Sequence, residues 1–160
     1  MQVHNVHERT YAASPPELGA VIDSLASGED RLWPSDRWPR IRFDRPLGTD
    51  AVGGHGPIRY TVEKYERGRG IVFRFTGPRG FDGTHGFRAD PTPGGVRLTH
   101  TLTMRASGPA WLTWPLVFRP LHDALVEDAL DRAALSLGLE PERKRWSPWV
   151  RGLRWLLDRR

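Results

Sequence analysis

Three histidines occupy positions from which their side chains are predicted to face one interior. His85 shares the two-residue phase of Phe87, and His100 shares that of Leu102 in a second alternating run. His122 lies near the centre of the apolar side of a helical segment. An imidazole titrates near neutral pH and can donate a hydrogen bond, accept one or ligate a metal. The trio is therefore predicted to line a cavity, where it can bind a ligand carboxylate or hydroxyl or move a proton in an aldol-type cyclisation.

The same histidines have two other interpretations. Each can be a buried core residue that is hydrogen-bonded to a neighbour or to water. A three-histidine zinc or iron site is the other alternative, but the sequence contains no HExxH motif and no paired His-x-His spacing. The serine and aspartate residues form no nucleophile elbow or triad pattern. We therefore expect polar cavity lining, with no metal, no cofactor and no covalent catalysis.

Apolar and aromatic side chains make up the rest of the predicted cavity wall, because ligand pockets are mostly apolar with a few placed polar groups. The predicted lining residues besides the histidines are Tyr60, Phe73, Phe75, Phe87, Leu102, Trp111, Trp114, Phe118 and Val126. Trp111 and Trp114 are predicted to lie near the cavity mouth, at the start of the last long helix. Trp33 and Trp38 either form the opposite lip or anchor their own irregular segment, and the second interpretation is favoured.

Alternation of apolar and polar residues predicts the strands that carry these side chains. Residues 58–63, 71–76 and 96–105 alternate with period two, and segments rich in glycine and proline separate them. Residues 2–11 are predicted to form a strand, although they show no clean inward face. A short strand is expected within residues 40–44. The middle of the chain is thus predicted to be an antiparallel meander.

Two helices are predicted outside this meander. Ser14–Glu17 matches a capping box with a proline at the first helical position, so a short helix begins there and ends near Gly28. Residues 110–137 are largely apolar, and Pro115 and Pro120 within them predict a kinked first part followed by a regular helix. The predicted apolar face of that helix consists of Val126, Ala129, Leu130, Ala133 and Leu137, with Asp123, Glu127 and Asp131 on the opposite face.

The order of these elements is α+β, with a last helix that covers one face of the sheet. In this order the chain resembles the START-like superfamily, also called the polyketide-cyclase and lipid-transport (SRPBCC) superfamily, whose helix-grip fold is also seen in the birch-pollen allergen. The segments that carry the resemblance are QVHNVHERTYAASPPEL, GPIRYTVEKYE with GIVFRF, GFDGTHGF with VRLTHTLTM, and PLHDALVEDALDRAAL. It covers residues 1 to about 137.

The resemblance implies a curved antiparallel sheet that wraps around the long helix and encloses a cavity for a hydrophobic, lipid-like or polyketide-like molecule. It also makes Gly53–Gly56 a candidate lid, whereas its composition alone indicates a tight connection into the next strand. Members with catalytic activity are a minority. We therefore favour a carrier of a hydrophobic small molecule over an enzyme. The alternative is a cyclase or dehydratase that uses one cavity histidine as general acid or base.

Composition excludes several classes of protein. The 160 residues contain no cysteine and are 38% hydrophobic, which fits one compact domain with a short appendage. Disulfide-stapled and thiolate-metal proteins are excluded. The sequence shows no apolar run of signal-peptide or membrane-span length. We therefore expect a cytoplasmic protein with a ligand-binding domain over residues 1–139 and a basic tail over residues 140–160.

Basic charge is concentrated in that tail. Residues 1–139 hold 17 basic and 16 acidic side chains, net +1, whereas residues 140–160 hold seven and three, net +4. In helical projection the tail gathers Trp149, Val150, Leu153, Leu156 and Leu157 on one face, with Arg151, Arg154 and Asp158 opposite. Such a helix can contact a membrane surface through residues 146–160, or it can dock on the body or on a second subunit in a homodimer, and docking is favoured. Nucleic-acid binding is not expected, because no base-reading module is present.

Overall fold

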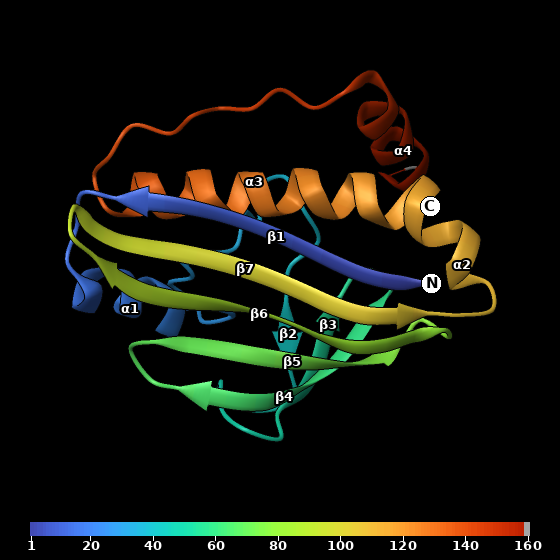
Figure 1. Cartoon of the computed structure of the whole chain (residues 1–160), viewed down its shortest axis with the longest axis horizontal. Helices are drawn as coiled ribbons and strands as arrows, with labels where there is room; N and C mark the ends of the chain where they lie inside the picture. The colour runs from blue at the N-terminus through green and yellow to red at the C-terminus, as the bar shows by residue number, and fades with distance from the viewer. Residues whose placement is uncertain (159–160) are drawn as a thin grey trace.

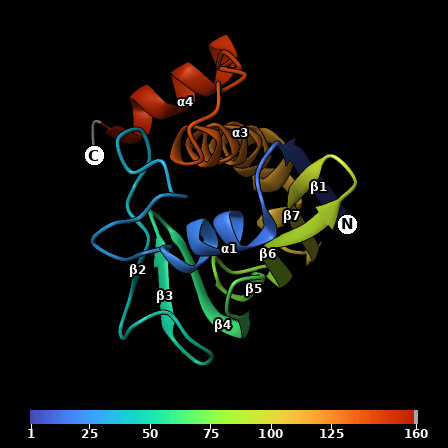
Figure 2. The same ribbon diagram turned by 90° about the vertical axis from the view of Figure 1, so that its left-hand side faces the viewer.

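The computed structural model describes residues 1–158, and a seven-stranded antiparallel sheet forms its frame (Figure 1). The strands are β1 (Gln2–Tyr11), β2 (Arg42–Phe43), β3 (Val52–His55), β4 (Ile58–Glu66), β5 (Gly70–Gly77), β6 (Phe81–Thr92) and β7 (Gly95–Ala106). Their spatial order is β1-β7-β6-β5-β4-β3-β2, so the first strand lies beside the last. The sheet curves, and the long helix α3 (Arg119–Ser136) lies along its concave side (Figure 2). The α+β class predicted from the sequence is confirmed.

Alternation along the central strands places one set of side chains beneath α3. In β5, Phe73 and Phe75 are buried, whereas Arg74 between them is exposed. The neighbouring strands β6 and β7 pair in unbroken antiparallel register from Phe81 opposite Ala106 to the turn between them. An unbroken register keeps the inward side chains of adjacent strands side by side, so the predicted alternation carries over into a common inner face.

The helices begin and end where local sequence signals place them, with one difference. Helix α1 (Pro15–Asp23) carries the predicted capping box, with Ser14 and Glu17 bonded to each other's backbone N–H. It ends at Asp23 rather than near Gly28, because the chain turns through Ala26, whose φ is +63°. The prolines divide the last helical region into α2 (Ala110–Thr113), a π-helical turn η1 (Trp114–Phe118) and α3.

The acidic side of α3, which the helical projection placed opposite the apolar face, packs against a strand. The inward residues of β1 meet it in a polar contact that we call the β1–α3 seam, formed by Asn5, His7, Arg9, Asp123, Glu127 and Asp131. Strand β1 therefore has an inward face, which is polar in its middle part and ends in buried Val3 and Tyr11. The helical projection grouped these acidic residues correctly but could not show that the edge strand β1 supplies their partners.

The tail lies against the body. Residues 140–147 cross the seam, where the backbone N–H groups of Glu142 and Arg143 donate to the Asp131 carboxylate. Helix α4 (Pro148–Asp158) follows, and its Val150 is buried. The Trp149 indole donates to the backbone carbonyl of Leu116, at a distance of 2.8 Å. Within residues 1–158, no helix is both long and apolar enough to cross a bilayer.

Candidate functional site

A cavity of about 110 Å³ lies between α3 and the inner face of the sheet. Most of the predicted lining residues surround it: His85, His100, His122, Phe73, Phe75, Phe87, Leu102, Trp114, Phe118 and Val126. Strands β5, β6 and β7 supply one wall, and η1 and α3 supply the other. The structure thus brings together side chains from three strands and two helical segments, as their phases indicated.

Two predicted lining residues lie elsewhere. Trp111 on α2 is 58% exposed, because the π-helical turn that follows it changes the phase between α2 and α3. Tyr60 on β4 does point inward, but it lies behind the wall and is fully buried. Its hydroxyl is 3.0 Å from Nδ1 of His55, and its ring packs against Phe73 and His85. Tyr60 therefore supports the wall from the core side.

Other lining residues come from the irregular part of the chain. His55 at the end of β3 lines the cavity, although it was not among the predicted lining residues, because it lies in a glycine cluster without periodicity. Trp33 and Trp38 line it as well. Both are also anchored, since the Trp33 indole donates to the carbonyl of Pro39 and the Trp38 indole to the Asp128 carboxylate. The two tryptophans therefore both line the cavity and anchor their own segment.

Asp128 is the residue that fixes this lip to α3. Its carboxylate is 5% exposed and accepts from the Trp38 indole at 2.7 Å, the Trp146 indole at 3.0 Å and the Arg37 guanidinium at 2.7 Å. Burial raises the pKa of Asp128, which these donors partly offset. One buried carboxylate thus ties the loop that carries Trp38 to the connection before α4.

The cavity histidines form a row of neighbouring rings. The ring centroids of His85 and His100 are 5.7 Å apart, and those of His100 and His122 are 5.0 Å apart. The His85 ring also stacks on Phe75 at 4.6 Å. The described residues provide no hydrogen-bond partner for His85 Nε2, His100 Nδ1 or His122 Nε2, although all three atoms are buried. Buried imidazole nitrogens normally have a partner, so a bound molecule is the natural candidate for one.

Burial keeps these imidazoles neutral. It lowers the pKa of His55 to about 3 and holds the pKa values of His85 and His100 well below 6.5, with the neighbouring histidines adding to the effect. The pKa of His122 is also lowered by burial, although the adjacent Asp123 opposes the shift. A neutral imidazole carries one donor and one acceptor, so the wall can hold either a hydroxyl or a carbonyl oxygen.

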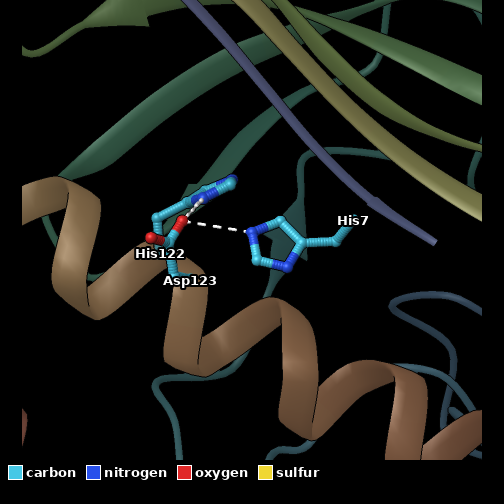
Figure 3. Close-up of side chains that lie close together, drawn as sticks. All are labelled: His7, His122 and Asp123. Carbon is cyan, nitrogen blue, oxygen red and sulfur yellow. Dashed lines mark hydrogen bonds and ion pairs between the residues drawn. The ribbon is translucent and has the colours of Figure 1, made fainter. Parts of the chain in front are cut away.

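His7, in the β1–α3 seam, has the opposite environment. Its Nδ1 lies 2.8 Å from Glu127 and its Nε2 lies 3.1 Å from Asp123. The hydrogen bond with Asp123 raises the pKa of His7, burial opposes this, and Glu127 adds to the increase. Figure 3 shows His7 facing Asp123 and His122 across the gap between β1 and α3. Donor atoms of His7, His122 and Asp123 lie within 4.8 Å of one another, a spacing that can hold a metal ion.

Solved structures share this architecture. No protein-family model matches the sequence, and no curated protein is significantly similar to it. CalU16 from Micromonospora echinospora superposes with a TM-score of 0.61 at 15% identity, over 96% of this chain and 83% of its own. StfQ, a di-domain ARO/CYC protein from the steffimycin biosynthetic pathway, gives 0.66 at 14% identity over 86% of this chain and 51% of its own. Ara h 8.0201 gives 0.60 at 13% identity, over 86% and 99%.

The chain therefore has the helix-grip fold. In this helix-grip domain, the cavity reaches the surface beside Pro39, Gly56 and Pro57, which line it and are exposed. Of the glycine-rich segment that was predicted to be a tight connection, Gly53, Gly54 and His55 belong to β3, and only Gly56 lies in the turn to β4. A Cβ on Gly54 would lie 2.0 Å from the carbonyl oxygen of Ile58, so close pairing of β3 with β4 requires a glycine there.

Proposed function

We propose that the protein binds and carries a hydrophobic small molecule in the cavity between α3 and the sheet. The observation that carries this proposal is the combination of an aromatic wall with buried imidazole nitrogens that have no partner within residues 1–158. Apolar area drives binding in such a site, and a few polar atoms fix the orientation of the ligand. His85 and His100 are the polar contacts, because their rings are adjacent and both line the cavity.

The cavity volume limits the ligand. An engineered cavity of roughly 150 Å³ holds benzene, and the cavity here is about 110 Å³. The enclosed part of a ligand is therefore about the size of a single ring. A longer lipid-like or polyketide-like molecule extends through the mouth at Pro39, Gly56 and Pro57, or binds after the wall moves outward.

The test is mass spectrometry of solvent extracts from the purified full-length chain. We expect one apolar compound in near-equimolar amount from the wild type. Leu121→Trp places a large ring in the cavity and is expected to abolish its recovery, because Leu121 lines the wall. Leu135→Trp is the matched control on the same helix, where Leu135 is 55% exposed. Equal recovery from both variants contradicts the proposal.

A second candidate is a cyclase or dehydratase acting on a polyketide-like substrate. The partnerless nitrogen of His100 favours it, and StfQ, which shares the fold, is an ARO/CYC protein. In this reaction His100 takes a proton from a methylene carbon, and that carbon forms a bond to a ketone carbonyl carbon. The protonated His100 returns the proton to the resulting alkoxide, and the hydroxyl group then leaves as water with the remaining hydrogen of the former methylene carbon. An efficient general base has a pKa near the working pH. Because burial holds the pKa of His100 well below 6.5, we rank this function second.

A synthetic linear tetraketide thioester, whose C2 methylene can close a six-membered ring on its C7 ketone, distinguishes the enzyme from the carrier. The enzyme converts it to a product that has lost one water faster than buffer does, and His100→Phe removes the acceleration. Recovery of the unaltered thioester at the buffer rate eliminates this second function and leaves the carrier.

A third candidate is contact with a membrane surface, which would deliver the cavity to lipid. Helix α4 docks by one edge, through Val150, and leaves Trp149 57% and Leu156 56% exposed. The bond from Trp149 to Leu116 joins this face to η1, where Leu116 is 57% exposed. Exposed Arg151 lies on the same helix. An apolar face beside arginine is suited to an interface of anionic lipid.

Co-sedimentation with vesicles that contain phosphatidylglycerol tests this contact. We expect the full-length chain to sediment with the vesicles and the double variant Trp149→Ser, Leu156→Ser to stay in solution. Leu135→Ser is the matched control, because it removes an equally exposed leucine from another face. If the double variant sediments like the wild type, membrane contact through α4 is excluded. Light scattering of the same samples tests whether the chain dimerises through this face instead.

A further inference from the structure

Three donor atoms from β1 and α3 converge beside the cavity (Figure 3). His7 Nε2 lies 3.1 Å, and His122 Nδ1 lies 3.4 Å, from the same oxygen, Asp123 Oδ1. All three atoms lie within 4.8 Å of one another. Around a first-row divalent ion with bonds of about 2.1 Å, ligand atoms stand roughly 3.0–3.4 Å apart. The two spacings to Asp123 Oδ1, 3.1 Å and 3.4 Å, lie in this range. A small approach of the two imidazoles toward each other brings the third spacing into the same range.

The groups behind these donors hold them in position. Glu127 lies 2.8 Å from Nδ1 of His7, which directs Nε2 of the same ring toward the other two donors. Glu127 in turn accepts from Arg9 at 3.0 Å. The Asn5 amide donates to Asp123 Oδ1 at 3.0 Å. Metal-binding histidines almost always bond their second ring nitrogen to a carboxylate, carbonyl or water in this manner, which fixes the ring and raises its basicity.

The three donors are accessible, and their chemistry is selective. The side chains of His7, His122 and Asp123 are 14%, 15% and 36% exposed, so an ion can enter from solvent. The ring of His122 also lines the ligand cavity. Two imidazoles and one carboxylate favour zinc, cobalt, nickel or ferrous iron over magnesium and calcium, which prefer sets of oxygen ligands.

We propose that His7, His122 and Asp123 bind one divalent transition-metal ion at the edge of the cavity. This site is separate from the proposed carrier function and does not depend on it. Three protein ligands leave at least one coordination position for water or for an atom of a ligand. Coordination through Nδ1 leaves the proton of neutral His122 on Nε2, which makes that buried nitrogen a hydrogen-bond donor. The ion thus fixes the tautomer that His122 presents beside the cavity.

A metal-free ion pair is the competing explanation. In it, protonated His7 donates to both Asp123 and Glu127, and the distances are the same as those described above. The two explanations differ in the response to added metal: the ion pair has no stoichiometric affinity for zinc, whereas the proposed site does.

Calorimetric titration of the chelator-stripped, full-length chain with Zn²⁺ tests the site. We expect one Zn²⁺ per chain. His7→Gln and Asp123→Asn lower the affinity by at least about tenfold, and Glu127→Gln lowers it by about tenfold, the smaller end of the range for supporting carboxylates. His4→Gln on the exposed face of β1 binds like the wild type. The proposal is overturned if the wild type binds no Zn²⁺, or if His7→Gln and Asp123→Asn bind it equally well.

A second measurement needs no variant and so does not depend on variant folding. Substoichiometric Co²⁺ added to the wild-type chain is expected to broaden the imidazole proton resonances of His7 and His122 before those of His4. Broadening of His4 first, with His7 and His122 unaffected, contradicts the site.

Discussion

His7 and His100 lie directly opposite each other on the neighbouring strands β1 and β7, yet their surroundings differ in every respect that matters to an imidazole. His7 has a carboxylate at each ring nitrogen, which raises its pKa. His100 is 2% exposed among apolar side chains and other histidines, and burial lowers its pKa. Two imidazoles at paired positions of neighbouring strands thus differ in protonation: His7 favours the protonated form, and His100 favours the neutral form.

The difference originates in the two faces of α3. Its acidic residues meet β1 at the edge of the sheet, whereas Val126 and Ala129 meet the strands farther in. The β1–α3 seam is therefore a polar joint that closes one side of the cavity, and the cavity wall itself remains apolar and neutral. This division confines the charges to the edge of the ligand space, where they hold the helix on the sheet.

Substitution of Arg9 is expected to have the largest effect on the free energy of unfolding. Arg9 is always charged, whereas His7 in the same seam is charged only when it is protonated. Arg9 is paired with Glu127 and Asp131, and its side chain is 9% exposed. Removal of one partner from a buried ion pair leaves uncompensated charge and typically costs about 3 kcal/mol or more. Arg9→Ala is therefore expected to lower the free energy of unfolding by about 3 kcal/mol, measured by urea denaturation.

The control is Arg97→Ala on the same sheet. Arg97 is 43% exposed and lies 3.6 Å from Glu8, so its loss is expected to cost less than about 1 kcal/mol. Equal losses for the two variants would mean that the seam is no more than a surface ion pair.

His7→Gln is expected to have the next largest effect on the free energy of unfolding, and this effect depends on pH. Because the folded-state pKa is raised above 6.5, the stabilisation by His7 is fully present below that pH and is lost as the pH rises through the folded-state value. With chelator present, the variant is expected to be about 1–2 kcal/mol less stable than the wild type at pH 5.5. The deficit decreases toward pH 8, and a deficit that grows with pH contradicts the ion-pair account of the metal-free seam.

His100→Phe is expected to act in the opposite direction. The imidazole is buried, and Nδ1 has no hydrogen-bond partner among the residues described, so an apolar ring of similar shape removes a desolvation cost. We expect the free energy of unfolding to rise by about 1 kcal/mol in the ligand-free chain. A loss of stability instead would show that His100 makes a structural hydrogen bond, for example to a buried water.

The smallest expected effect concerns the pKa values of the histidines, not the free energy of unfolding. In the chelator-treated chain, NMR of the imidazole protons is expected to show His7 titrating above 6.5 and His85 and His100 still neutral at pH 5.5. Titration of all three near 6.5 would remove the distinction between seam and cavity.

The sequence predicted the fold well because the fold depends on local signals. Alternation located β4, β5 and β7, the capping box located the start of α1, and Pro115 and Pro120 located the interruption before α3. Phase likewise placed His85, His100 and His122 toward one interior, and the structure brings them around one cavity.

The seam could not be predicted from hydrophobic patterning alone. A helical projection places Asp123 and Glu127 opposite the apolar face, and only tertiary pairing with β1 reveals their partners. Strand β1 offers no clear pattern, because His4, Glu8 and Thr10 are polar like Asn5, His7 and Arg9. His55 offers none either, because a turn separates it from the alternating run of β4.

Calorimetric titration with phenol, a single-ring probe that matches the cavity volume, tests the central claim, a single small-molecule site between α3 and the sheet, most directly. The wild type and Leu135→Trp are expected to bind one phenol per chain with the same affinity, and Leu121→Trp is expected to bind none, because its added ring fills the cavity. Equal binding by all three chains, or no binding by the wild type, would contradict the account.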